Sequence, residues 1–196
     1  MKKKYTPRWP LMTAVLCVGV IGGYLLTQMN TPKPTTATNQ PPTKETCLAD
    51  DCLAVDSIES YPVGTLSNEA KQALESALDD EYHALSFYEK VIAKFGTVKP
   101  FSMIKNSEEQ HIAMLQAIYD KYGLTPKPNT WPQKLIAPDT LQQSCQTGVE
   151  AEIANAELYR TKLLPAVTMY EDITIVFTNL MNASQQKHLQ AFERCN

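Results

Sequence analysis

The chain has 196 residues, of which 43% are hydrophobic and 20% charged, a composition that suits one compact domain with extensions. Its net charge at pH 7 is −3. Without a basic cluster at the N-terminus, 14 basic residues face 21 acidic ones, a net charge of −7; that cluster is Lys2, Lys3, Lys4 and Arg8. An acidic domain without a basic patch argues against nucleic-acid binding.

The first 26 residues predict a membrane signal-anchor. An uncharged apolar run from Leu11 to Leu26 follows the basic cluster and is about 16 residues long, which is the short edge of what spans a bilayer. Because positive charge precedes the run, we expect a single-pass segment in a bacterial cytoplasmic membrane, with the C-terminal domain extracytoplasmic. Secretion after signal cleavage is the alternative, although Val20-Ile21-Gly22 offers only a partial cleavage pattern.

Residues 27–65 predict a linker that includes a small cysteine loop. Residues 27–46 are rich in Thr, Pro, Asn and Gln and have no apolar periodicity, so they cannot bury enough surface to fold. Four cysteines lie on the translocated side and predict two disulfides in an oxidising compartment; they are Cys47, Cys52, Cys145 and Cys195. Half a zinc site at the first two is the weaker alternative, because a second matching pair is missing.

Residues 66–196 predict a bundle of four helices. Ser67 is a typical N-cap for the first helix, and Gly96 is a typical end. Between them one face carries residues at alternating spacings of four and three, which is a helical stripe with a carboxylate in its middle. The stripe is Leu74, Leu78, Glu81, Leu85, Tyr88, Ile92 and Phe95.

The second helix is expected to run from near Pro100 to Gly123. Its stripe is again polar at the centre and apolar at the ends: Phe101, Ile104, Glu108, His111, Leu115, Ile118 and Tyr122. Only Thr97 to Lys99 separates the first two helices, so we expect them to be antiparallel neighbours.

The proline-rich segment 124–138 excludes a helix and suits a crossover between two helical hairpins. Asp139 with Gln142 forms a capping-box pattern for the third helix, which Pro165 is expected to end or kink. The third stripe is Leu141, Cys145, Gly148, Glu152, Asn155 or Ala156, Tyr159 and Leu163.

The fourth helix is expected to begin between Thr168 and Asp172, with a second capping-box pattern at Thr168–Glu171. Its stripe is Ile173, Phe177, Leu180 or Met181, Ser184 or Gln185, His188, Phe192 and Cys195. Antiparallel helices place the start of the third beside the end of the fourth. We therefore pair Cys145 with Cys195, and Cys47 with Cys52.

The polar interruptions of the stripes converge in one layer of the bundle. Glu81 lies ~22 Å before the first turn, and Glu108 and His111 lie ~17–21 Å past it, at 1.5 Å per residue. The same count places Glu152 level with Gln185. Unpaired carboxylates in a core cost several kcal/mol and repel one another. A bound cation removes both penalties, so the pattern favours a metal site.

The spacing Glu108-x-x-His111 on one of four helices is the ligand pattern of ferritin-like di-metal carboxylate proteins. From about Leu66 to Phe192 the chain resembles the ferritin-like family called domain of unknown function 2202. The matching segments are Glu81-x-x-Ala84-x-x-x-Tyr88, Ser107-Glu108-x-x-His111, Tyr122-Gly123-Leu124 and His188-Leu189-x-Ala191-Phe192. The resemblance implies an all-α, antiparallel, ferritin-like four-helix bundle and suggests a metal site, but supplies no activity.

A full ferritin-like site has a second Glu-x-x-His, whereas this chain has Gln185 before His188. Three carboxylates remain, which weakens the case for two tightly held ions and leaves room for one ion or for a site that has decayed. We expect Glu81 and Glu152 as terminal ligands, Glu108 as a bridge, and nitrogen ligands at both helical histidines. The expected ligands are Glu81, Glu108, His111, Glu152 and His188, surrounded by Tyr88, Asn155, Tyr159 and Gln185; His83 is expected on the solvated surface.

Three functions remain open from the sequence. The first is oxidase, ferroxidase or peroxidase chemistry at bound iron or manganese. The second is metal sequestration or sensing without catalysis, and the third is a structural or interaction module with a metal-free polar core. The sequence decides neither catalysis nor the oligomeric state, for which a homodimer is one option.

Overall fold

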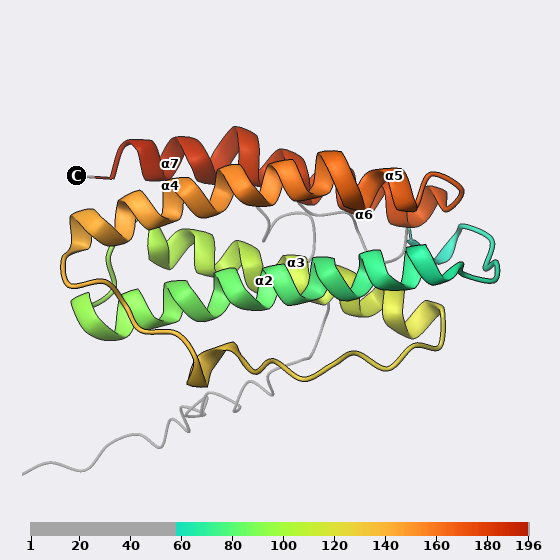
Figure 1. Cartoon of the computed structure of the whole chain (residues 1–196), viewed down its shortest axis with the longest axis horizontal. Helices are drawn as coiled ribbons and strands as arrows, with labels where there is room; N and C mark the ends of the chain where they lie inside the picture. Colours follow the sequence, from blue (N-terminus) through green and yellow to red (C-terminus); the bar gives the residue numbers. More distant parts are fainter. Residues whose placement is uncertain (1–57, 196) are drawn as a thin grey trace, which may run out of the picture. The chain divides into compact units, whose positions relative to one another are not determined.

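The computed structural model describes residues 58–195, and within that range the chain forms four long helical segments without a strand (Figure 1). The expected anchor, most of the expected linker and the Cys47–Cys52 pair lie outside the described residues. Among the residues described, none of the helices combines the length and apolar character needed to cross a membrane. The expected all-α four-helix bundle is confirmed.

The first hairpin consists of α2 (Asn68–Phe95) and α3 (Phe101–Lys121). Ser67 caps α2 as predicted, since its Oγ accepts a hydrogen bond from the backbone N–H of Ala70 at 3.1 Å. Gly96 ends the helix with a φ of 86°, a left-handed conformation that a residue without Cβ adopts without strain.

The crossover runs along the bundle from the end of α3 to the start of α4 (Figure 1). It is irregular as expected, apart from one short 3₁₀ turn, η1 (Trp131–Gln133). Side-chain contacts fasten it to α2: Trp131 Nε1 donates to Asp79 at 3.0 Å, and Asn129 Nδ2 donates to Ser86 at 3.0 Å. The crossover therefore returns the chain to the far end, so that α4 runs antiparallel to α2.

The third segment comprises α4 (Leu141–Leu158), the π-helical turn η2 (Tyr159–Leu163) and α5 (Leu164–Ala166). The expected capping box at Asp139 was wrong by one residue. Thr140 is the N-cap, and it exchanges hydrogen bonds with Gln143 at 3.1 and 3.0 Å. The segment ends at Ala166, one residue past Pro165, as expected for a helix that reaches a proline.

The fourth segment comprises α6 (Glu171–Ala183), the π-helical turn η3 (Ser184–His188) and α7 (Leu189–Glu193). It begins inside the predicted window, but the capping box expected at Thr168 is not formed. Tyr170 is the N-cap, and its side chain makes no capping hydrogen bond to the first turn of the helix. Two acidic residues in the first turn, Glu171 and Asp172, instead favour the helix start through the helix dipole.

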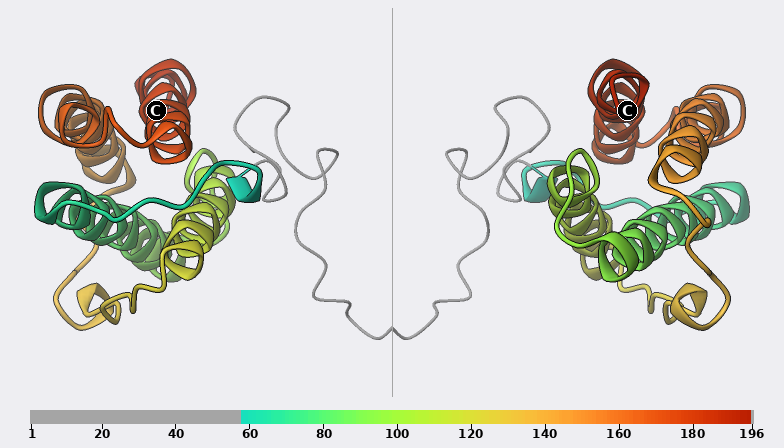
Figure 2. Two further views of the ribbon diagram at one scale, coloured as in Figure 1. Left: turned by 90° about the vertical axis from the view of Figure 1, so that its right-hand side faces the viewer. Right: turned by 90° about the vertical axis from the view of Figure 1, so that its left-hand side faces the viewer.

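The end-on views show the α2–α3 hairpin beside the second hairpin, formed by the third and fourth segments (Figure 2). The two helices of the second hairpin are joined covalently by the predicted disulfide between Cys145 and Cys195, whose Cα atoms are 5.7 Å apart. The disulfide therefore fixes the end of the bundle at which α4 begins and α7 ends.

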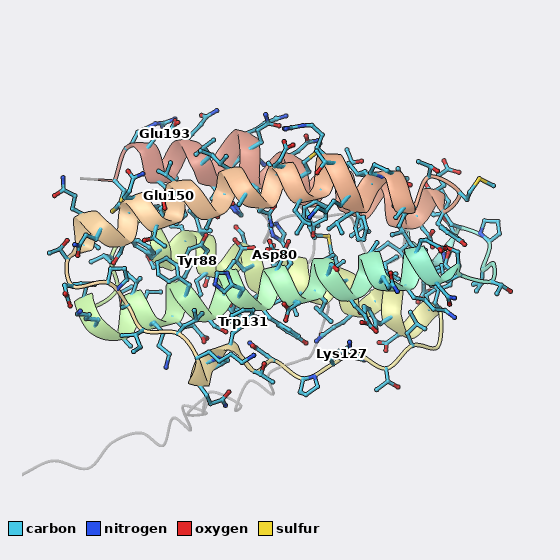
Figure 3. The ribbon with its side chains drawn as sticks, in the orientation of Figure 1. Asp80, Tyr88, Lys127, Trp131, Glu150 and Glu193 are labelled. Atoms are coloured by element: carbon cyan, nitrogen blue, oxygen red, sulfur yellow. A yellow bond between two sulfur atoms is a disulfide. The ribbon has the colours of Figure 1, made fainter. Side chains whose placement is uncertain are left out.

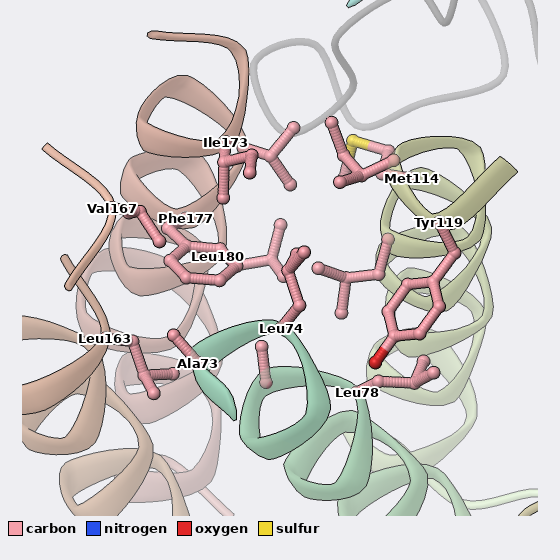
Figure 4. Packing of buried hydrophobic residues seen from close by; sticks show 14 of the residues in the cluster. Ala73, Leu74, Leu78, Met114, Tyr119, Leu163, Val167, Ile173, Phe177 and Leu180 are labelled. Atoms are coloured by element: carbon pink, nitrogen blue, oxygen red, sulfur yellow. The ribbon is translucent and has the colours of Figure 1, made fainter. Parts of the chain in front are cut away.

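The apolar core is divided into two clusters. One, shown in Figure 4, centres on Leu74, Phe177 and Leu180; the other centres on Phe101 and Phe192 near the disulfide. Ile58 is 2% exposed and belongs to the first cluster, so the packed domain begins before residue 66. The polar residues expected in the middle of each stripe are also buried, but they belong to neither apolar cluster.

Candidate metal centre

Five buried side chains from all four helical segments meet in the core. Each is at most 3% exposed, although each is polar: Glu81 on α2, Glu108 and His111 on α3, Glu152 on α4 and His188 at the end of η3. The structure thus brings together every residue that the stripes predicted as a metal ligand. Whether they hold a metal is a separate question of geometry and charge.

The five residues form two triads that share Glu108. In the first, His111 Nδ1 lies 2.8 Å from Glu108 Oε2 and 3.2 Å from Glu81 Oε2. In the second, His188 Nδ1 lies 3.2 Å from Glu108 Oε1 and 3.5 Å from Glu152 Oε2. The donor atoms of each triad lie within 4.8 Å of one another. Glu108 therefore offers one oxygen to each triad, as a bridging carboxylate does.

Two tyrosines each donate a hydrogen bond to one oxygen of a terminal carboxylate on the other helix. Tyr88 on α2 donates to Glu152 Oε1 on α4 at 2.5 Å, and Tyr159 at the start of η2 donates to Glu81 Oε1 on α2 at 3.0 Å. Both hydroxyls are buried, and each tyrosine follows a glutamate on its own segment by seven residues. Each carboxylate is thereby oriented with its other oxygen toward a histidine.

Asn155 lies beside the cluster, as predicted, in a chain of three polar groups. Ser184 Oγ donates to Asn155 Oδ1 at 2.7 Å, and Asn155 Nδ2 donates to Asp80 Oδ2 at 2.5 Å. The sequence reading missed Asp80, which looks like one of two consecutive surface acids on α2. The signal that could have revealed it is Asn155, an amide on an otherwise buried stripe that requires partners on both sides.

The structure does not bring Gln185 to the cluster. Its side chain is exposed, and its Oε1 accepts from Arg160 at 3.3 Å. The reason is the π turn at Ser184–His188, which holds more residues per turn than an α-helix. In such a turn the residue four positions before His188, Ser184, faces the core, and the residue three before it does not.

The expectation that His83 is a solvated surface residue was wrong in part. Its ring is half-buried and packs edge-on against Trp131 of the crossover, with ring centroids 4.6 Å apart. This burial lowers the pKa of His83. His83 nevertheless belongs to neither triad.

Burial and mutual charge strongly perturb the cluster. Burial and the neighbouring Glu108 raise the pKa of Glu81 to about 8. Burial opposes a charge on the histidines, but the carboxylates outweigh it: Glu108 raises the pKa of His111 to about 10, and Glu108 with Glu152 raises that of His188 well above its usual value. Burial would also raise the pKa of Glu108, yet the two histidines hold it far below normal.

The residues present fit a divalent metal. Three buried ring nitrogens have no hydrogen-bond partner among the described residues: His111 Nε2, His188 Nδ1 and His188 Nε2. His188 Nδ1, which faces two carboxylates without a hydrogen bond, is the informative one because metal coordination would satisfy it. Carboxylate and imidazole together suit iron, manganese or zinc. The donor set does not by itself select the metal.

Comparison with known proteins gives a fold but no activity. No family model and no curated protein matches the sequence. Among solved structures, the chain is similar to a hypothetical protein from Methanococcus jannaschii DSM 2661, with 20% sequence identity and a TM-score of 0.59 over 69% of this chain and 83% of that one. The resemblance to domain of unknown function 2202 therefore stays a prediction. At this level of identity the likeness shows a shared helical fold, with which a ferritin-like bundle is compatible.

Proposed function

We propose that this chain binds divalent iron or manganese in the core of its bundle through Glu81, Glu108, His111, Glu152 and His188. The observation that carries the proposal is the shared carboxylate: Glu108 directs one oxygen to each of two carboxylate–histidine pairs. A cluster stabilised only by hydrogen bonds has no need of two such pairs around one bridging group. The two triads give positions for one ion, or for two ions that share Glu108.

Once its groups have lost their protons, the cluster favours a bound cation. Three ionised carboxylates with two neutral histidines carry a charge of −3 in a desolvated core, which is costly without a cation. Bound iron or manganese would supply one-electron redox chemistry, the basis for an oxidase or ferroxidase activity. In that setting Tyr88 and Tyr159 orient the terminal carboxylates, and the two apolar clusters exclude bulk water.

A metal-free structural core is the second candidate, and one observation favours it. His111 Nδ1 already hydrogen-bonds Glu108 and lies 3.2 Å from Glu81. With both histidines protonated, two ionised carboxylates suffice for neutrality. Such a core would be stable without any cation, and its function would lie in the surface of the bundle.

The deciding experiment is the effect of metal on the melting temperature of residues 58–196, purified without metal. Iron(II), manganese(II) or zinc(II) should raise the Tm, because a ligand that binds only the folded state stabilises it. His111→Ala should reduce both the shift and the bound metal, because it removes one of the two histidine ligands. His83→Ala, the matched control outside both triads, should retain both at equilibrium. Unchanged Tm with all three ions, well above micromolar concentrations, would support the metal-free core.

We also propose that the bundle is exported and anchored by residues 1–26, on the strength of the sequence pattern alone. The Cys145–Cys195 disulfide is in keeping with an oxidising compartment. A reporter fused after Asn196 should be active only outside the cytoplasm. Reporter activity in the cytoplasm would refute this topology.

A further inference from the structure

A cavity between α2 and α4 leads from the surface to the candidate metal centre. Its volume is about 120 Å³, and its lining includes the exposed Ala154, the half-buried Asp80 and the buried Glu108 and Glu152. At about 30 Å³ per water molecule, this space corresponds to about four waters. It can therefore hold a cation that has kept part of its hydration shell.

Asp80 is fixed in this cavity by the polar chain that starts at Ser184. Asn155 accepts from Ser184 and donates to Asp80, so its amide is held at both ends. Figure 3 shows Asp80 and Tyr88 on the side of α2 that faces α4. Asp80 is not a member of either triad. It places a carboxylate between solvent and the two glutamates that line the same cavity.

A second cavity reaches the centre from another side and has a different character. It has a volume of about 190 Å³, lies between α3 and the η3–α7 segment, and touches His188. Its lining includes Pro100, Met103, Ile104 and Ala191, and no carboxylate. A hydrated cation loses solvation in such surroundings without gaining an oxygen ligand. The two cavities thus differ in whether carboxylates line them, and carboxylates are what a divalent ion needs along its path.

We propose that the α2–α4 cavity is the route by which a divalent cation reaches the centre, and that Asp80 is the carboxylate that draws the cation in. The inference rests on the proposed metal-binding function and adds a residue outside the five ligands. Asp80 acts as a positioning residue: it attracts the cation at the surface and passes it to Glu108 and Glu152, whose carboxylates line the same space. Removing its charge should therefore change rates more than affinity.

The test compares Asp80→Asn with Asp79→Asn, which makes the same change one residue away at an exposed position. Asparagine at position 79 can still accept the hydrogen bond from Trp131. Cobalt(II) is the probe, because its visible absorption reports binding to carboxylate and histidine ligands in stopped-flow mixing. We expect Asp80→Asn to slow association about tenfold at low ionic strength, with dissociation slowed in step, and Asp79→Asn to stay within about twofold of wild type.

A pair of blocking variants tests the route without altering charge. Ala154 and Met103 are both exposed, and each lines only one of the two cavities. Ala154→Trp should slow cobalt loading, and Met103→Trp should not. The reverse pattern would overturn the route.

The remaining outcomes separate the route from the metal site itself. Wild-type association in Asp80→Asn would overturn the role of Asp80 while leaving the proposed function intact. Faster dissociation with unchanged association would do the same, since Asp80 would then stabilise the bound ion. Failure of wild type to bind cobalt at equilibrium would instead refute the proposed function.

Discussion

The hydroxyl of Tyr88 on α2 donates a hydrogen bond of 2.5 Å to Glu152 Oε1 on α4, and Tyr159 repeats the contact in the opposite direction to Glu81. The α2 helix and the α4–η2 segment thus each supply a terminal carboxylate and the tyrosine that orients the carboxylate of the other. Burial and the nearby carboxylates raise the pKa of both tyrosines well above normal, so both hydroxyls stay protonated and donate.

Tyr88→Phe should weaken metal binding without removing a ligand. Glu152 Oε1 would lose its donor and be free to rotate away from His188, and loss of such an outer contact typically costs about 10–100-fold in metal affinity. Metal titration of the purified domain measures the change. Tyr119→Phe is the control, because Tyr119 is also buried, at 3% exposed, and lies in the apolar cluster that contains Leu74. Equal affinities for Tyr88→Phe and wild type would show that the tyrosine only fills space.

The stability of the metal-free domain should fall as the pH rises. Glu81, with a pKa raised from 4.5 to about 8, binds a proton in the folded state that it loses on unfolding. His111, raised from 6.5 to about 10, does the same at higher pH. The folded state therefore binds more protons between about pH 4.5 and pH 10, and its free energy of unfolding decreases across that window.

Metal should reverse this trend, because carboxylates and histidines bind it only after losing their protons. The rise in Tm on adding manganese(II) should be larger at about pH 8 than at about pH 5. Thermal melts across the range, with and without metal, measure both effects. A metal-free Tm that increases from pH 5 to pH 8 would contradict the pKa assignments.

Reducing the Cys145–Cys195 disulfide should destabilise the bundle by about 2–4 kcal/mol, because the bond closes a long loop in the unfolded chain. The two cysteines are 50 residues apart in sequence. Denaturant unfolding of Cys195→Ser against wild type measures the loss. Metal binding should survive, since the bond lies at the end of the bundle. Loss of metal from this variant at temperatures well below its Tm would show that the disulfide also holds the site in shape.

Gly148→Ala should destabilise the domain by about 1–3 kcal/mol through overpacking. A Cβ at this position of α4 would lie 2.6 Å from the ring of Phe192, which is 1% exposed and cannot move outward freely. Phe192 packs on Tyr88 with ring centroids 5.3 Å apart, so the strain should also reach the hydrogen bond to Glu152. Gly64→Ala is the control, since nothing lies within 4 Å of its added Cβ. Comparable stability of the two variants in denaturant would contradict this account.

Helical periodicity was enough to find the five buried polar residues, because a stripe fixes both the face and the height of each side chain. Glu81 and Glu108 are both found in this way from the sequence. The sequence does not decide which residue caps α4, because Asp139-x-x-Gln142 and Thr140-x-x-Gln143 both fit the capping-box pattern. The structure shows that Thr140 is the N-cap. Asp80 was missed because its partner lies 75 residues away on another helix.

The two π turns could not be predicted from the sequence either, because they depend on how a whole helical segment packs rather than on local propensity. Helical periodicity does not distinguish Ser184 from Gln185, because both lie about one α-helical turn before His188. The structure resolves this choice in favour of Ser184.

In length, a wide turn is equivalent to an α-helix that has gained one residue, and the Ser184–His188 segment can be read as such an insertion. In a regular helix, a ligand three residues before the histidine would face the centre. Here the π turn places Ser184, four residues before His188, in that position. The position of the missing fourth carboxylate is consequently Ser184. A carboxylate introduced at Gln185 would lie on the surface. A four-carboxylate centre in this bundle would therefore require a carboxylate at Ser184. That substitution would remove the hydrogen bond that Ser184 donates to Asn155, which would then need another donor.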